Sequence, residues 1–90
     1  MDKRNIFDII SSKQLLTELS WIKYYDNGAS LREYKIYKPK SIKPIAFIQI
    51  GQYDITQKVI GLSVTYANDI QPPIDCETLT EFERTLDNII

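Results

Sequence analysis

A chain of 90 residues is long enough for one globular domain and too short for two, so we treat residues 1–90 as a single domain. Hydrophobic residues make up 43% of it and charged residues 26%, which excludes an intrinsically disordered chain. The formal net charge is −1, so the chain as a whole lacks the basic character typical of nucleic-acid-binding domains.

The chain has a single cysteine, Cys76, and no histidine. One cysteine excludes an intramolecular disulfide and a zinc site built from thiolates. The missing histidine removes the commonest metal ligand and the commonest general base. We therefore expect no metal site and no cofactor.

No stretch of the sequence approaches the roughly 18 apolar residues of a membrane span. The apolar residues 6–10 follow a charged N-terminus, as in a secretion signal, but they are too few and Asp8 interrupts them. We expect a cytoplasmic protein with no membrane partner.

The first element predicted is a helix over residues 5–20. Leu15, Leu16 and Leu19 fall on one arc of a helix turning by about 100° per residue, whereas the apolar residues 6–10 fall on another. The polar residues 11–14 between them suggest a bend, with Ser12 capping the second piece of helix.

Residues 21–25 admit two interpretations. Their aromatic and β-branched side chains favour a strand, with Asp26, Asn27 and Gly28 forming a hairpin turn after it. The pair Asn27-Gly28 is also suited to ending a longer helix with a left-handed cap.

Three strands are predicted in the middle of the chain. Residues 31–38 form the first, which ends before Pro39, and the nearly continuous apolar run 44–50 forms the second. Residues 58–66 alternate, with Ile60, Leu62, Val64 and Tyr66 on one side and Val59, Gly61, Ser63 and Thr65 on the other. Asn68-Asp69 and Pro72-Pro73 then interrupt the chain.

The last helix is predicted over residues 79–90. Thr78 and Glu81 have the spacing of a capping box. Leu79, Phe82, Leu86 and Ile89/Ile90 follow at steps of three and four residues and form one apolar stripe. The expected fold is α+β: a two-layer sandwich with an N-terminal helix, a three- or four-stranded antiparallel sheet and a C-terminal helix, both helices on one sheet face.

This order of elements resembles that of double-stranded-RNA-binding domains, which run helix, three strands, helix. Those domains place lysines at the start of the final helix, where this chain has Glu77, Thr78 and Glu81. The resemblance is therefore one of topology, and we do not carry the function across.

The first candidate surface is basic. It comprises Arg32, Lys35, Lys38, Lys40 and Lys43, on a strand and the loop after it. Lysines placed in this way can contact phosphates with a salt-sensitive, sequence-independent attraction. Lysine and proline at this position also protect an edge strand from aggregation, which needs no ligand.

The second candidate surface is the sheet face that the helices leave open. Side-chain alternation assigns to it Trp21, Tyr25, Tyr37 and Phe47, interleaved with Lys23 and Lys35. Such a face can anchor a protein interface or stack on single-stranded bases. The assignment depends on the alternation keeping its phase across Pro39.

The third candidate surface is acidic and includes Asp69, Asp75, Glu77, Glu81, Glu83 and Asp87. Asp75, Glu77 and Glu81 suit the N-terminus of a helix, where the macrodipole favours negative charge. Glu83 and Asp87 are four residues apart, so they repel, and Asp87 lies at the unfavourable end of the dipole. Either a basic partner or a basic side chain brought near by folding would explain them.

The sequence offers little catalytic machinery. Cys76 has no histidine to activate it, and no serine occupies a nucleophile-elbow motif. Gly51 and Gly61 are isolated, so no phosphate-binding loop is predicted. We expect a protein that is not an enzyme and has no small-molecule substrate.

We therefore expect a module that binds a protein and inhibits or modulates a larger, basic partner, such as a protein that handles nucleic acid; homodimerisation stays open. Abundant Ile, Lys, Asn and Tyr indicate an AT-rich genome, as in a low-GC bacterium or its mobile elements. Small size and a mildly acidic balance resemble phage- or plasmid-borne inhibitors, among them anti-CRISPR and immunity proteins. The alternative is a nucleic-acid-binding domain that uses the lysine run and the aromatic face.

Overall fold

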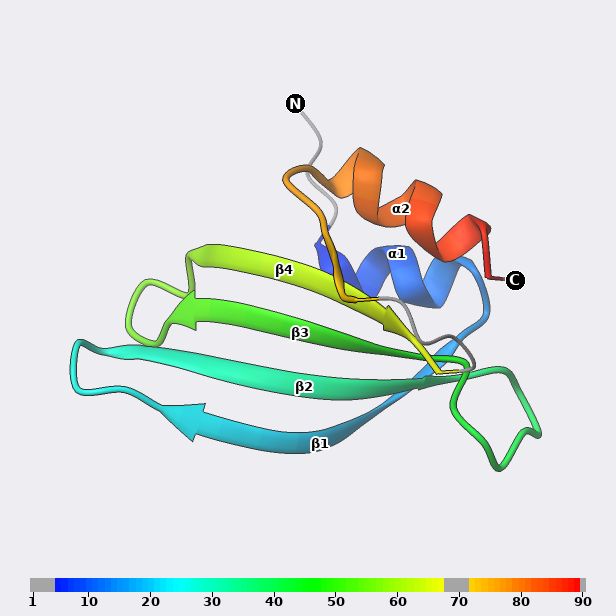
Figure 1. Ribbon diagram of the computed structural model, residues 1–90, viewed down its shortest axis with the longest axis horizontal. Coiled ribbons are helices and arrows are strands. Elements are labelled where there is room, and N and C mark those ends of the chain that lie inside the picture. The colour runs from blue at the N-terminus through cyan, green and yellow to red at the C-terminus, as the bar shows by residue number, and fades with distance from the viewer. Residues whose placement is uncertain (1–4, 68–71, 90) are drawn as a thin grey trace.

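The computed structural model describes residues 5–67 and 72–89. The chain forms α1 (Ile6–Ser12), β1 (Leu16–Tyr24), β2 (Ala29–Tyr37), β3 (Ala46–Tyr53), β4 (Val59–Tyr66), β5 (Ile74–Asp75) and α2 (Leu79–Asp87). The strands make one antiparallel sheet in the order β1-β2-β3-β4-β5, with both helices on the same face (Figure 1). The predicted α+β fold is confirmed, with five strands instead of three or four.

The first helix is shorter than predicted. Asn5 caps α1 by accepting from the backbone N–H of Asp8 at 2.8 Å, and Asp8 accepts from that of Asn5 at 3.0 Å. The chain reverses at Gln14, where φ is 60°. The prediction of a helix to residue 20 is wrong, and so is the role of Ser12, whose hydroxyl donates to the carbonyl of Ile9 at 2.7 Å in the last turn of α1.

The physical reason for this error is strand pairing that local sequence does not reveal. The leucines of residues 15–19 have helical spacing, but β1 pairs with β2 from Leu16 to Tyr24, except at Ser20. The strand interpretation of residues 21–25 is therefore correct, and the helix interpretation is wrong. The hairpin turn also forms as predicted, with φ of 84° at Gly28.

A β-bulge interrupts β1. Leu19 pairs with Tyr34 and Trp21 pairs with Glu33, so Ser20 has no partner on β2. A bulged residue reverses the side-chain alternation. Thr17 and Leu19, before the bulge, therefore lie on the helix-covered face together with Ile22 and Tyr24, after it.

The core lies between the helices and the central strands. Its fully buried side chains include Ile9 and Ile10 of α1, Ile36, Ile48 and Val64 of the sheet, and Phe82 and Leu86 of α2. The predicted stripe of the last helix is thus core. Burial of such side chains contributes roughly 1.5–3 kcal/mol each.

The alternation predicted for β4 holds from Leu62 to Tyr66. It fails at Val59, because the register shifts between Gly51 and Gln52, and Val59 pairs with Gln52. Val59 therefore lies on the helix side of the sheet, and Ile60 is the extra residue, with no partner on β3.

The helix α2 begins as predicted at the Thr78 cap, whose hydroxyl accepts from the N–H of Glu81 at 3.1 Å. The carboxylate of Glu81 reaches the N–H of Glu77 at 3.2 Å, one residue further back than a capping box requires. The helix ends at Asp87, earlier than the predicted residue 90. Ile90 and the predicted break at 68–69 lie outside the described residues.

The helices cover only part of their sheet face. The sheet extends beyond both of them toward the β1–β2 and β3–β4 turns (Figure 1). In the part of the chain that the structure describes, no helix has the length and apolar character needed to cross a bilayer.

Candidate functional site

The side chains that point away from α1 and α2 form what we call the open face. Register and alternation place on it Leu16, Glu18, Trp21 and Lys23 of β1, Leu31, Glu33, Lys35 and Tyr37 of β2, Phe47, Gln49, Gly51 and Tyr53 of β3, Gly61, Ser63 and Thr65 of β4, and Asp75 of β5. The alternation keeps its phase across Pro39, because Tyr37 and Phe47 lie on the same side. An antiparallel sheet with one bare face exposes it to solvent or to a partner.

Three of the four aromatic residues predicted for this face lie on neighbouring strands. Each of three consecutive cross-strand rows of the open face carries one of these rings: Tyr37 on β2, then Phe47 on β3, then Trp21 on β1. Trp21 is 40% exposed, and the other two rings are half-buried. Lys35 of β2 lies between Glu18 of β1 and Phe47 of β3 in one cross-strand row. A positive and a negative side chain therefore stand in the same row as the Phe47 ring.

A chain of hydrogen bonds crosses the open face from β1 to β4. Trp21 Nε1 donates to Glu33 Oε2 at 2.9 Å, and Gln49 Nε2 donates to Glu33 Oε1 at 2.8 Å. Gln49 Oε1 in turn accepts from Ser63 Oγ at 2.9 Å and from Thr65 Oγ1 at 3.3 Å. Because both oxygens of Glu33 are engaged, the indole ring is held in one orientation.

Sequence reasoning did not find this hydrogen-bonded chain. Glu33 faces Trp21 only because the bulge at Ser20 shifts the register, and nothing local signals that shift. Gln49 could have been suspected as the one polar side chain in an otherwise apolar central strand segment, 45–50.

The fourth predicted aromatic residue, Tyr25, lies at the hairpin end of the open face. The Nζ atom of Lys23 is 5.3 Å from its ring centroid. Tyr53, which pairs with Ala29, brings another exposed ring to the same end. Sequence reasoning missed Tyr53 because the predicted strand stopped at Ile50.

The open face is hollowed where two glycines pair. Gly51 and Gly61 lie opposite each other and leave a depression of about 320 Å³ beside Leu31, Gln49 and Ser63. A Cβ at Gly61 would meet no atom within 4 Å. The depression can therefore accept a side chain from a partner.

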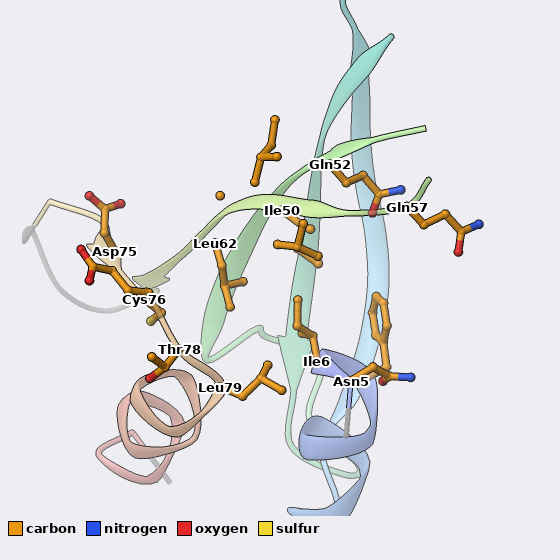
Figure 2. A pocket seen from close by; sticks show the side chains of 15 residues that line it. Asn5, Ile6, Ile50, Gln52, Gln57, Leu62, Asp75, Cys76, Thr78 and Leu79 are labelled. Carbon is orange, nitrogen blue, oxygen red and sulfur yellow. The ribbon is translucent and has the colours of Figure 1, made fainter. Parts of the chain in front are cut away.

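A groove of about 910 Å³ lies on the other face, where the sheet extends beyond the helices (Figure 2). Most of its apolar lining comes from the first turns of both helices and from β3 and β4: Ile6, Phe7, Ile50, Ile60, Leu62 and Leu79. The two helix caps, Asn5 and Thr78, stand beside it and are engaged in capping bonds. Sequence reasoning missed the groove, because its existence depends on where the helices stop.

Cys76 also lines this groove and is buried. Its Sγ atom lies 3.8 Å from Thr85 Oγ1 and 3.7 Å from the carbonyl of Ile74. Burial raises the pKa of the thiol, and the carboxylates of Glu81 and Asp75 add to the rise, although the contact with Thr85 opposes it. The thiol therefore stays protonated near neutral pH, which makes it a poor nucleophile.

The acidic residues do not form one surface. Glu83 and Asp87 both lie beside Lys13, whose Nζ is 3.9 Å from Glu83 Oε2 and pairs directly with Asp87 Oδ1. A basic side chain brought near by folding thus accounts for their spacing. Glu81 belongs to the start of α2, Asp75 faces Ser63 on the open face, and Asp69 lies outside the described residues.

The basic residues are also dispersed. Arg32 lies on the helix side with its Nη2 3.7 Å from Asp54 Oδ1, and its buried Nε has no hydrogen-bond partner among the described residues. Lys35 lies on the open face. Lys38, Lys40 and Lys43 are exposed in the loop between β2 and β3. The five residues therefore occupy three separate places.

Within residues 5–67 and 72–89, no group of three or more acidic or cysteine side chains is arranged to hold a metal ion. Comparisons with protein-family models, with curated proteins and with solved structures find no match to this chain. The functional inference therefore depends on the geometry of the open face.

Proposed function

We propose that the protein is a cytoplasmic protein-binding module that docks its open face on a larger protein and inhibits or modulates it. The observation that carries the proposal is the oriented indole of Trp21 on a sheet face that also carries Tyr37 and Phe47 and has no helix over it. Tryptophan and tyrosine are over-represented among the residues that dominate binding energy at protein interfaces.

The hydrogen bonds of Glu33 support this proposal on energetic grounds. A side chain already fixed in its bound orientation loses less conformational entropy when a partner docks. Since Glu33 holds the indole of Trp21 and the amide of Gln49 together, the centre of the open face is ordered before binding.

The charges of the open face favour a protein over a nucleic acid. Glu18 and Glu33 lie among the aromatic residues of the open face, and Asp75 lies at its β5 edge; all three repel phosphates. Together with Lys23 and Lys35 they form the mixed polar surround that is typical of a protein interface. At the β5 end, Asp75 suits a basic group of the partner.

We further propose that the protein acts by occupying its partner and catalyses no reaction. Its composition fits a phage or mobile element of a low-GC bacterium. Anti-CRISPR and immunity proteins are small inhibitors of this general kind, and a basic, nucleic-acid-handling protein is the partner that we expect.

The experiment is a differential capture from the lysate of a low-GC bacterium, carried out with and without nuclease treatment. The wild-type chain is compared with Tyr37→Ala/Phe47→Ala and with Gly61→Leu, which places a side chain into the open-face depression without removing a contact. The matched control is Tyr24→Ala/Ile55→Ala, because both residues are highly exposed and lie off the open face.

We expect a protein that the wild-type chain and the control retain and that both open-face variants lose. Circular dichroism must show that all the variants fold. Equal retention by every variant contradicts the proposal. Retention that disappears with nuclease treatment would instead favour the nucleic-acid alternative.

A further inference from the structure

The outer edge of the sheet at β1 is long and exposed. Of its nine residues all but Ile22 are exposed, and no proline interrupts the strand. It pairs only with β2 among the described strands, and Figure 1 shows it at the margin of the sheet, on the side away from both helices. A long, exposed edge presents a row of backbone N–H and C=O groups that can pair with another strand.

We propose that β1 pairs with β1 of a second copy of this chain, antiparallel and about a two-fold axis, to make one continuous sheet. The interface is the backbone edge of β1, which borders the open face, and self-association does not depend on the partner proposed above. Closed two-fold symmetry is the commonest arrangement of homo-oligomers.

The bulge at Ser20 restricts the register, and charge then selects it. In an antiparallel pair, facing residues must lie on the same face of the sheet. Because the bulge reverses the alternation, Thr17 and Leu19 share a face with Ile22 and Tyr24. Apart from the pair that contains Ser20, every pair matches if the two-fold axis passes either between Leu19 and Ser20 or between Ser20 and Trp21. Only the second of these registers places Glu18 opposite Lys23.

That register is complementary in charge and in polarity. Glu18 faces Lys23 of the second copy, and symmetry repeats this pair, so two opposite-charge contacts form on the open-face side. On the helix side Leu19 faces Ile22 of the second copy, again twice. Cross-strand pairs of both kinds stabilise antiparallel sheets.

The register also joins the two open faces. Trp21 of one copy comes next to Ser20 of the other at the two-fold axis, so the two Trp21 side chains become neighbours. The merged sheet presents two copies of the same binding surface on one side.

The test measures molecular mass by sedimentation equilibrium over a range of concentrations. The wild-type mass should rise from 10.5 kDa toward twice that value as concentration increases. Glu18→Lys and Lys23→Glu should each weaken self-association by about tenfold or more, because each makes both symmetric pairs repulsive. The controls Glu77→Lys and Lys58→Glu carry the same charge changes at exposed positions away from β1 and should leave self-association unchanged.

Two complementary samples make the register falsifiable. An equimolar mixture of Glu18→Lys and Lys23→Glu restores attraction in both pairs, and so does the double variant Glu18→Lys/Lys23→Glu. Both samples should therefore recover the dimer. Circular dichroism confirms that each chain is folded.

The proposal is overturned if the wild-type chain stays monomeric up to about 1 mM. In that case the β1 edge would be available to pair with a strand of a different protein. It is equally overturned if a dimer forms that neither single charge reversal weakens, or if the mixture and the double variant fail to recover it.

Discussion

Replacing Glu83 and Asp87 with their amides tests how the two helices are held together. The side chain of Lys13, at the end of α1, is only 12% exposed and pairs with both carboxylates of α2. In Glu83→Gln/Asp87→Asn this ammonium loses both anionic partners while staying largely desolvated. Reasoning from α2 alone predicts the opposite, because the change relieves a like-charge pair and the unfavourable position of Asp87 in the helix dipole.

The expected magnitude follows from the distances and exposures. Unit charges 3.9 Å apart attract by about 4 kcal/mol at an effective dielectric constant of about 20. Solvent screening at Asp87, which is 59% exposed, and the entropy of ordering the lysine reduce the net effect of both pairs to about 1–2 kcal/mol. Relief within α2 returns roughly 0.5 kcal/mol. We expect a net loss of about 1 kcal/mol.

The assay is urea unfolding followed by the fluorescence of Trp21 and by circular dichroism. The midpoint should fall with an unchanged slope, and the difference from wild type should shrink at high salt. In a Lys13→Met background the same two amide changes should have no destabilising effect, which isolates the interaction. Equal or higher stability of the amide variant in the wild-type background would refute the reasoning.

Three further predictions concern the core, the thiol and nucleic acid. Leu86→Ala should lower the free energy of unfolding in urea by about 2–5 kcal/mol, because the side chain is fully buried. The exposed Leu16→Ala is the control, and a loss below about 1 kcal/mol for Leu86→Ala would contradict its place in the core. Cys76 should react with a disulfide reagent far more slowly in the folded chain than in urea, and fast reaction of the native chain would contradict its burial. The contribution of this thiol to stability should decline above a pH of about 9, because the unfolded thiol has the lower pKa and ionises first. In a fluorescence titration at about 150 mM salt, nucleic acid should not bind with submicromolar affinity, since the basic residues are dispersed; tight binding would favour the alternative function.

The elements that sequence reasoning predicted correctly are those in which local pattern and long-range packing agree. The stripe of α2 has the 3.6-residue period of a helix, and Phe82 and Leu86 are fully buried in the structure. Residues 61–66 alternate with the period of a strand, and Val64 lies in the core. Tyr37 and Phe47 were assigned to one face from alternation alone, and the register places them there.

The errors lie where distant residues decide the structure. Leu15, Leu16 and Leu19 have helical spacing, but pairing with β2 makes residues 16–24 a strand, which begins directly after Leu15. The bulge at Ser20 sets the phase of Trp21, and sequence offers no local signal for it. Nonlocal pairing of this kind overrides propensity, which is a weak preference.

The candidate site was only partly predictable for the same reason. Its aromatic side chains follow from alternation, whereas the carboxylate of Glu33 that orients Trp21 follows from register. The pair formed by Lys13 and Asp87 joins residues 74 positions apart, so no local pattern could show it.

The central claim is that the open face binds a protein, and a calorimetric titration with the captured partner tests it most directly. The wild-type chain, Phe47→Ala and Tyr24→Ala are each titrated after circular dichroism has shown that they are folded. The account predicts that Phe47→Ala weakens binding by roughly 30-fold, as expected when an interfacial anchor worth about 2 kcal/mol is lost, and that Tyr24→Ala changes it little. A change of less than about threefold for Phe47→Ala, or an equal loss for Tyr24→Ala, would contradict it.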